Sequence, residues 1–395
     1  MVDARVLAVP VVPRQLSAQR GRDPYPYFGW LRANAPALPE LRAGGYTVWY
    51  VSRYEDVLSL LADQRLSKNP DLVPGYVSGP LGANRHLVHA DPPEHARLRK
   101  LVGAAFLPRR IAALEPLIAG TARQLLDRAD PAQGMDLIED FALPLTFTLI
   151  CTILGVPEQL ITPATRQLLA DTMVPSHASD TREQLQVFLR QLVACKRLGA
   201  ATELDLLGAL AHARGDRLTE EELVSTAYLL LLVGHDTTVN LIGNGMLALL
   251  RNPEQLRRLR EEPELMRTGV EELLRYDSPV RNATFRVAAE PISLHGNTIQ
   301  SGDIVSLLIG SANRDEARFP EPDVLDLARD PNEHLAFGRG PHFCVGAALA
   351  RLEGGIAFRL LLDRLGDPRL AVPEDALRWR PCRVMRGLVS LPVTA

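Results

Sequence analysis

The sequence predicts a mainly α-helical protein with small β-sheets. Helix signals dominate residues 91–277 and return over residues 345–366. Between these stretches, after Pro279, short runs of β-branched residues alternate with turn signals such as His295-Gly296-Asn297. No shift in composition and no repeat marks a domain boundary, so we expect a loose N-terminal arm over residues 1–20 and one domain over residues 21–395.

The composition excludes several classes of protein. Of the 395 residues, 46% are hydrophobic and 23% are charged, which is typical of a globular chain and not of a disordered one. The 44 basic residues do not outnumber the 47 acidic ones, so nucleic-acid binding is disfavoured. Four cysteines are too few for a disulfide scaffold. We therefore expect a cytoplasmic monomer that binds no nucleic acid.

The sequence also predicts no membrane segment. The longest apolar run, residues 227–234, is much shorter than the ~20 residues that a spanning helix needs. Residues 1–5 lack the basic region of a signal peptide.

Local patterns predict the elements in order. A strand is expected over residues 46–51 and a helix over residues 53–63, followed by a loop rich in proline and glycine over residues 68–89. Asp91-Pro92-Pro93-Glu94 predicts a helix start with Asp91 as its cap, and Thr219 with Glu222 predicts a capping box. The helix after Thr219 should reach Arg251. Further strands are expected over residues 283–288, 292–294, 298–300, 304–309 and 388–393.

One cysteine lies in an unusual setting. Cys344 follows a glycine-dense turn and precedes the last predicted helix. Glycines allow positive φ and a close approach to a flat ligand, and backbone N–H groups at a helix start favour thiolate over thiol. Such a thiolate suits either a nucleophile or a metal ligand. Zinc is disfavoured because no second cysteine stands at ligand spacing.

Residues 337–346 resemble the haem-binding loop of the cytochrome P450 superfamily in its bacterial form. The resemblance implies a two-lobed domain with haem b (iron protoporphyrin IX) between the long central helix and the helix after the cysteine. It implies that Cys344 is the axial ligand of the iron. Further haem contacts would come from Phe337, Gly338, His342 and Gly346.

A second pattern lies inside the long predicted helix. Asp236 and Thr237 interrupt an apolar run, where polar groups are costly unless they have partners. Gly234 weakens the helix there, and Thr237 can bond the carbonyl of Val233, which predicts a local bulge. An ordinary buried threonine would look the same. The segment resembles the family's oxygen-activating groove, which implies that Gly234 lies beside the haem.

The same resemblance assigns roles within that groove. Thr237 would hydrogen-bond dioxygen and Asp236 would relay protons. Val233 stands where the family has alanine or glycine, which implies a narrower pocket.

Two sets of charged residues are expected near the haem, one with a structural role and one that binds the cofactor. Glu272 and Arg275 share a helix face at i, i+3, a spacing typical of a solvated surface pair. The resemblance instead makes them, with Arg329, a structural cluster. His95 and Arg99 share a face at i, i+4 and suit an anion, although surface exposure is the ordinary alternative. The resemblance implies that the haem propionates are bound by His95, Arg99, Arg286 and His342.

The reaction and its partners follow from the resemblance. It implies a monooxygenase that uses dioxygen and receives electrons from NAD(P)H through a ferredoxin and a ferredoxin reductase. Exposed bases could form the docking face, or they could be scattered solvated charges. These bases are Arg97, Lys100, Arg109, Arg110 and Arg339.

Matching segments suggest the substrate walls. They are mostly apolar and predict a lipophilic small molecule, such as a bacterial macrolide, polyketide or terpenoid. The walls comprise residues 69–88 and 173–178, Tyr228, Leu232, Val233, Val280, Arg281, Asn282, Ala283, Thr284 and residues 385–388 with Met385. The alternatives are a peroxygenase or an oxidative-coupling enzyme of the same fold, and a haem-binding sensor or carrier.

Overall fold

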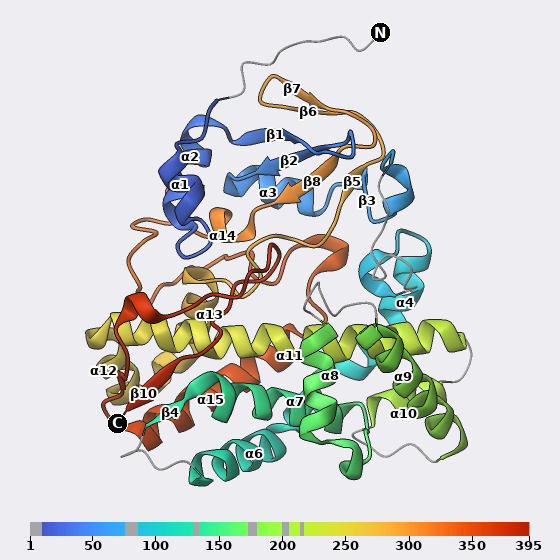
Figure 1. Ribbon diagram of the computed structural model, residues 1–395, viewed down its shortest axis with the longest axis vertical. Coiled ribbons are helices and arrows are strands. Elements are labelled where there is room, and N and C mark those ends of the chain that lie inside the picture. The colour runs from blue at the N-terminus through green and yellow to red at the C-terminus, as the bar shows by residue number, and fades with distance from the viewer. Residues whose placement is uncertain are drawn as a thin grey trace. The chain divides into compact units, whose positions relative to one another are not determined.

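The structure is a computed structural model that describes residues 10–75, 86–128, 134–172, 180–199, 205–213 and 217–394. The chain forms two compact units. The first unit comprises Met1–Ser78, Arg267–Cys344 and Arg378–Gly387, and the second comprises Gly79–Met266, Val345–Leu377 and Leu388–Ala395. Helices dominate and the sheets are small, which confirms the predicted fold class (Figure 1).

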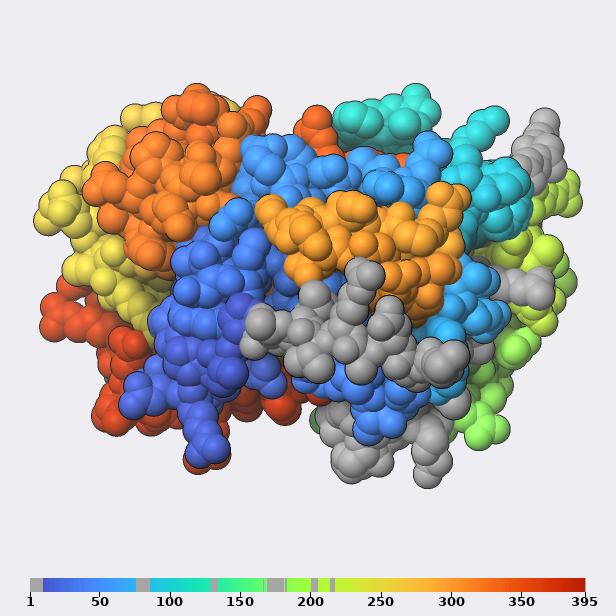
Figure 2. All heavy atoms as spheres, turned by 90° about the horizontal axis from the view of Figure 1, so that it is seen from above, coloured from blue at the N-terminus to red at the C-terminus, as the bar shows by residue number. Residues whose placement is uncertain are grey.

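A five-stranded sheet organises the first unit. Its order is β1 (Ala37–Leu41), β2 (Thr47–Val51), β8 (Ile304–Leu307), β5 (Val287–Ala288) and β3 (Leu66–Ser67). The β2–β8 pair is parallel, with Val51 opposite Leu307, and joins segments far apart in the chain. Figure 2 shows blue N-terminal segments of this unit beside orange segments that come much later in the chain.

The core of the first unit lies between this sheet and its helices. Val57 and Leu61 of α3 (Tyr54–Leu61) share a buried cluster with Val51 and Leu307 of the sheet. The remaining elements are α1 (Arg14–Gln19), α2 (Tyr25–Asn34), α13 (Met266–Tyr276), α14 (Ile309–Ala312) and the hairpin of β6 (Ile292–Leu294) and β7 (Asn297–Ile299).

The second unit is built around the long helix α11 (Glu220–Arg251). Thr219 and Glu222 form the predicted capping box, and the helix has the predicted 32 residues. Its neighbours include α7, α9 and α15 (Figure 1). The helices of this unit are α4 (Glu94–Gly103), α5 (Pro108–Ala112), α6 (Glu115–Arg128), α7 (Leu143–Ile153), α8 (Pro163–Thr172), α9 (Asp180–Leu198), α10 (Leu206–Ala211), α11, α12 (Pro253–Glu261) and α15 (Ala347–Leu365). Its small sheet has the order β4 (Met135–Asp136), β10 (Pro392–Thr394) and β9 (Arg369–Leu370).

A glycine in α15 allows close packing on α11. A Cβ atom at Gly354 would lie 2.9 Å from Cδ2 of Leu241, closer than real Cβ contacts. Glycine is disfavoured inside helices, costing ~1 kcal/mol relative to alanine, and here it permits this approach. Nothing in the structure explains the neighbouring Gly355, whose Cβ would meet Met266 at an ordinary 3.8 Å.

Several predicted boundaries differ from those observed. Residues 14–19 of the expected loose arm form α1, which buries no residue. The helix α4 begins at Glu94 with Pro93 as its N-cap, and no side-chain cap bond is present, so the predicted cap by Asp91 is wrong. The strand expected over residues 283–288 shortens to β5 because residues 283–286 pair irregularly, and residue 309 begins α14.

The last strand, two predicted substrate walls and the membrane prediction can also be compared with the structure. The final strand begins at Pro392, later than expected. The predicted wall over residues 173–178, and part of the one over residues 69–88, lie outside the described residues. Among the described residues, none of the helices combines the length and apolar character that crossing a membrane requires.

Candidate active site

The loop that carries Cys344 has the predicted geometry. Gly338 and Gly340 adopt φ angles of 71° and 72°, which side chains disfavour. The backbone N–H of Cys344 donates to the carbonyl of Phe337 at 2.9 Å, which closes the loop. The residue is exposed, whereas Cys151 is buried. The chain then enters α15, with Gly346 as its N-cap, so Cys344 sits at the start of a helix as predicted.

Aromatic rings flank the same loop. The ring of Phe337 lies 6.3 Å from that of Phe343 and 6.0 Å from that of His334, measured between centroids. His342 is half-buried and ends the short 3₁₀ turn Gly340–His342. Phe337 therefore stands where it can cover one side of the cysteine loop.

A buried cation in the first unit suits an anionic group. The side chain of Arg286 is almost inaccessible, with 3% of the residue exposed, and burial lowers the pKa of its guanidinium to about 10. It donates to the carbonyl of Thr284 at 2.9 Å, and no carboxylate among the described residues pairs with it. Buried charges normally have a counter-charge. A haem propionate would supply one, so this residue fits the group that the sequence implies.

The predicted oxygen-activating residues lie at the centre of α11 in the second unit. Over residues 222–249, which the structure describes throughout, Ser225, Val233, Gly234 and Thr237 are the residues that are not buried. Val233 is 45% exposed. Val233 and Thr237 share one helix face at i, i+4. The helix therefore presents a small accessible strip at the predicted position.

The expected bulge at this strip is wrong. The helix α11 is continuous from Glu220 to Arg251. Thr237 Oγ1 donates to the carbonyl of Val233 at 2.6 Å, as predicted, and the helix absorbs this bond without a break. A Cβ at Gly234 would lie 2.8 Å from Cδ1 of Ile150, so this glycine also serves the packing of α7 on α11.

Buried polar groups flank the strip. Asp236 is 6% exposed and His235 is 5% exposed. Nδ1 of His235 lies 2.8 Å from Oγ1 of Thr146 on α7. His235, for which the sequence suggests no role, thus links the two helices beside Asp236.

Helix α4 carries the two predicted propionate ligands of the second unit. His95 is buried and Arg99 is half-buried, one turn apart. Arg97, predicted as part of a docking face, is held by Glu94 and Glu222 and donates to the carbonyl of Arg217 at 3.2 Å. Its guanidinium is therefore engaged within the unit.

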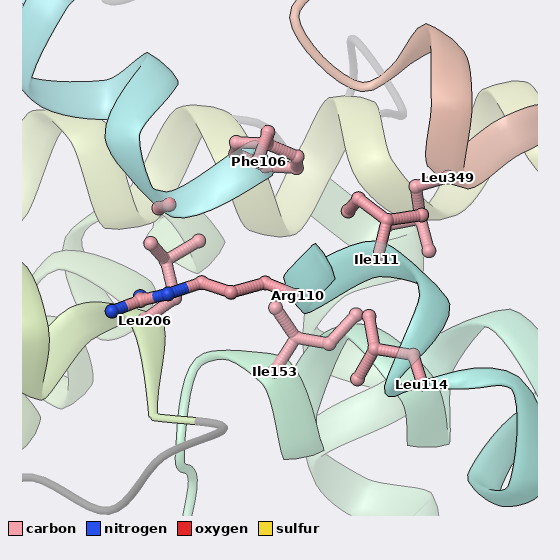
Figure 3. A pocket seen from close by; sticks show the side chains of 8 residues that line it. Phe106, Arg110, Ile111, Leu114, Ile153, Leu206 and Leu349 are labelled. Carbon is pink, nitrogen blue, oxygen red and sulfur yellow. The ribbon is translucent and has the colours of Figure 1, made fainter. Parts of the chain in front are cut away.

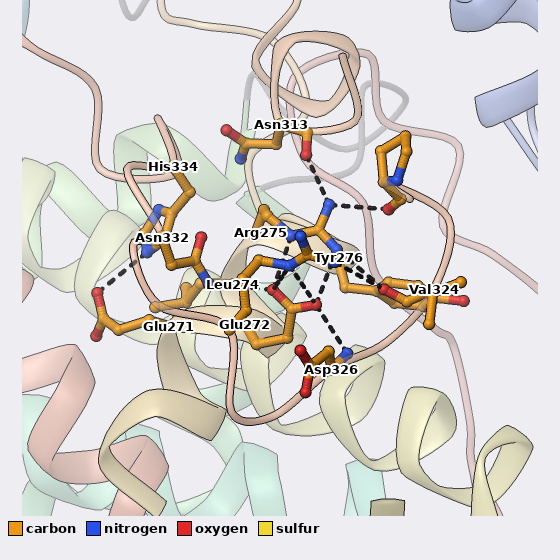
Figure 4. Close-up of polar contacts among 12 residues, drawn as sticks. Glu271, Glu272, Leu274, Arg275, Tyr276, Asn313, Val324, Asp326, Asn332 and His334 are labelled. Atoms are coloured by element: carbon orange, nitrogen blue, oxygen red, sulfur yellow. Dashed lines mark hydrogen bonds and ion pairs between the residues drawn. The ribbon is translucent and has the colours of Figure 1, made fainter. Parts of the chain in front are cut away.

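Glu272 and Arg275 form a buried cluster and not a solvated pair (Figure 4). Both side chains are 0% exposed and are joined by two bonds of 2.7 and 2.8 Å. Arg329 Nε lies 3.2 Å from Glu272 Oε2, which brings together the predicted third member. Glu272 also accepts from the backbone N–H of Asp326 at 3.0 Å and from Nδ2 of Asn332 at 3.1 Å. One carboxylate thus fixes the segment that leads to the cysteine loop.

Two predicted substrate walls meet in the first unit. Val280 and Met385 form an isolated β-bridge. Arg281, predicted as a substrate-wall residue, donates to the backbone carbonyls of Arg383 at 3.1 Å and of Cys382. Burial, followed by the charge of Arg386, lowers the pKa of Arg281. Arg281 therefore ties the two walls together, with Asn282 and Ala283 following it along the chain.

The side chain of Thr284 is hydrogen-bonded to a buried lysine. Lys68 is 1% exposed, and its ammonium lies 2.7 Å from Oγ1 of Thr284 and 2.9 Å from the carbonyl of Phe285. It also lies 3.4 Å from the Thr284 carbonyl that binds Arg286. On α11, Tyr228 and Leu232 are buried, so Val233 is the exposed member of those three predicted wall residues.

Two pockets of the second unit are lined by residues other than the predicted haem, catalytic and substrate-wall residues. One, of about 20 Å³, has room for about one water molecule and is lined by apolar side chains together with Arg110, whose stem runs past Ile153 and Leu206 (Figure 3). The other, an open groove of about 860 Å³, is lined by residues of α6 and α7 and by Lys196 and Asp205. Neither lining includes a predicted site residue.

The sequence prediction missed Glu353 on α15. This residue is 3% exposed, and burial raises the pKa of its carboxyl to about 8, although a hydrogen bond with Thr238 of α11 acts in the opposite direction. The sequence contains a signal for this position, because Glu353 follows Leu349 and precedes Ile356 at the spacing of residues that face the core side of a helix. It lies behind the accessible strip of α11, next to a neighbour of Thr237.

We expect Glu353 to make folding stability depend on pH. Its folded pKa of about 8 exceeds the ordinary 4.5, so the folded state binds more protons between these values. The stabilisation is complete below the ordinary pKa and is lost as pH rises through about 8, at up to about 1.4 kcal/mol per pH unit. Glu353→Gln should remove this dependence. Urea unfolding of both proteins at about pH 5 and about pH 9 measures it, and parallel pH profiles would contradict it.

Taken unit by unit, the site has the features of a haem-thiolate protein. The cytochrome P450 family model matches residues 6–168 and 169–366. Cytochrome P450 107B1 of Saccharopolyspora erythraea is 43% identical over 367 residues, covering 88% of this chain and 89% of that protein. Cytochrome P450 monooxygenase PikC of Streptomyces venezuelae is 42% identical over 381 residues, covering 94% and 91%.

The solved structures agree. The cytochrome P450 PksS of Bacillus subtilis has a TM-score of 0.89 at 35% identity, covering 95% of this chain and 97% of that one. The chain belongs to the cytochrome P450 family. It is a haem-thiolate monooxygenase that uses dioxygen and receives electrons from a redox partner.

Proposed function

We propose that this monooxygenase binds haem b through Cys344 and oxidises a lipophilic metabolite of polyketide or macrolide type in the cytoplasm. Its electrons come from NAD(P)H through a ferredoxin and a ferredoxin reductase. The observation that carries the proposal is the loop of Cys344, with its two positive-φ glycines and the bond to the Phe337 carbonyl. The relative PksS is named for polyketide biosynthesis, which supports the substrate class.

The residues present fit the cofactor. Haem iron bound by a thiolate supplies the activation of dioxygen. Cys344 provides that thiolate, with Phe337, Gly338 and Gly346 around it. The buried guanidinium of Arg286 would bind a propionate, and the family resemblance assigns the same role to His342, His95 and Arg99.

Residues in and beside the accessible strip of α11 transfer protons and limit the size of the substrate group that can approach. Thr237 Oγ1 is accessible and can turn from the Val233 carbonyl to donate to oxygen. Asp236, buried beside it, relays protons from solvent through its carboxyl group. Val233 projects from the same face and limits the size of group that can approach.

Thr237→Ala should uncouple electron use from product formation. The variant lacks the donor at Oγ1 but keeps haem and substrate binding, because within the described part of the chain the Thr237 hydroxyl bonds only to the Val233 carbonyl of its own helix turn. We expect product per NAD(P)H consumed to fall about tenfold, which corresponds to the loss of one hydrogen bond of about 1.4 kcal/mol, with hydrogen peroxide released instead. Thr237→Ser keeps the hydroxyl and is the matched control. Unchanged coupling in the alanine variant would remove Thr237 from the reaction.

A ligand screen tests the proposal as a whole. Purified holoprotein is titrated with macrolides, linear polyketides and terpenoids while the haem absorption is recorded. Compounds that shift it are then tested for stimulated NAD(P)H consumption with a surrogate ferredoxin and reductase. We expect macrolides or polyketides to do both. Turnover with hydrogen peroxide but none with ferredoxin and dioxygen would favour the peroxygenase alternative.

A further inference from the structure

His334 lies next to the cysteine loop and was assigned no role from the sequence. Its side chain is 3% exposed. Nε2 lies 3.1 Å from Oε2 of Glu271 on α13, as Figure 4 shows. Nδ1 accepts the backbone N–H of Ala336 at 3.2 Å. Both ring nitrogens are therefore used.

These two contacts define the protonation state of the ring. A backbone N–H can only donate, so Nδ1 must be the unprotonated nitrogen. Nε2 then carries the hydrogen and donates to Glu271. The imidazole is neutral, with a single tautomer selected by its neighbours.

The contacts of His334 continue to the cysteine. The Ala336 N–H that it binds belongs to the Leu335–Ala336 peptide, and Phe337 is the next residue along the chain. The Phe337 ring packs on the imidazole, at 6.0 Å between centroids, and the Phe337 carbonyl accepts the N–H of Cys344 at 2.9 Å. Ala336 and Phe337 thus link the imidazole to the Cys344 backbone.

Two adjacent glutamates of α13 bind different parts of the segment that leads to the cysteine loop. Glu272 binds Asp326, Arg329 and Asn332, whereas Glu271 binds His334. Asn313 adds a third support, since its Oδ1 accepts the N–H of Leu335 at 2.7 Å. His334 is the member of this set that contacts Ala336 and Phe337, and the carbonyl of Phe337 is hydrogen-bonded to the Cys344 N–H.

We propose that His334 is a positioning residue for the thiolate: its Nδ1 lone pair holds the Leu335–Ala336 peptide, and this contact, with the packing of the Phe337 ring on the imidazole, positions the Phe337 carbonyl that fixes the Cys344 backbone. Glu271 keeps the ring in the required tautomer. The proposal rests on the proposed function, because it concerns Cys344 as haem ligand. The group that matters is the acceptor at Nδ1, and not the bulk or the charge of the side chain.

Two matched substitutions test the roles of the two ring nitrogens of His334 separately. In His334→Asn, Oδ1 stands near the place of Nδ1 and keeps the acceptor, but the bond to Glu271 is lost. In His334→Gln, Nε2 keeps the donor to Glu271, but the acceptor is lost. His334→Leu removes both. The readout is the rate at which the reduced carbon monoxide complex of the holoprotein converts from its thiolate band, at about 450 nm, to one at about 420 nm.

We expect the asparagine variant to convert at close to the wild-type rate. The glutamine and leucine variants should convert about fivefold faster, the factor that corresponds to one hydrogen bond. Unfolding by urea is measured in parallel, since a merely structural role predicts rates that follow global stability in all three variants. Equal rates for asparagine and glutamine, or rates that follow stability alone, would overturn the inference. A wild-type protein with no band near about 450 nm would instead overturn the proposed function.

Discussion

We expect Cys344→Ala to abolish the thiolate signature and the oxygenase activity. Without the sulfur, the reduced carbon monoxide complex should absorb near about 420 nm and not about 450 nm, and turnover should fall to background. The physical reason is that residues 337–346 contain no second cysteine that could take the place of Cys344. Among the described cysteines, Cys151 is buried on α7 and burial raises the pKa of its thiol to about 12, which keeps it protonated.

A matched cysteine variant controls for the loss of a thiol. Cys195 is exposed, like Cys344, but lies on α9. Cys195→Ala should keep the thiolate band and wild-type turnover. Persistence of the band in Cys344→Ala would show that another residue binds the iron, and would contradict the assignment of Cys344.

Glu272→Gln should cause the largest loss of stability. The carboxylate is fully buried and faces Arg275, also 0% exposed, and Arg329. Replacing it by an amide of equal size leaves these guanidinium groups without their counter-charge. Breaking a buried pair in this way costs about 3–5 kcal/mol. The free energy of unfolding in urea measures the effect.

An exposed glutamate provides the comparison. Glu261 ends the neighbouring helix α12 and is exposed. Glu261→Gln should change the unfolding free energy by less than about 0.5 kcal/mol, as surface substitutions do. Equal effects of the two substitutions would mean that Glu272 contributes no more than a surface charge.

Local sequence rules predicted the features that depend on neighbouring residues. The partners of the capping box, Thr219 and Glu222, are three positions apart in the chain, and so are Glu272 and Arg275. The loop of Cys344 could be predicted because its glycines determine the backbone directly. In each case the interacting groups are adjacent in the chain, so their contact needs no knowledge of the fold.

Features that depend on tertiary packing were missed or mispredicted. Lys68 and Thr284 are 216 residues apart, and His334 and Glu271 are 63 apart, so no local pattern connects them. Gly354 is unfavourable by helix propensity and is explained only by Leu241 of another helix. The bulge expected at Thr237 did not form, because a continuous helix accommodates the bond to Val233.

The contact between Lys68 and Thr284 has a practical consequence for engineering. Thr284 belongs to a predicted substrate wall, which makes it a natural target for libraries that aim to change selectivity. Its hydroxyl, however, is hydrogen-bonded to a deeply embedded ammonium. Variants with alanine or valine at this position would leave that ammonium poorly solvated, so altered selectivity would come with lower expression and reduced thermal tolerance. Screens that vary position 284 should therefore vary position 68 with it.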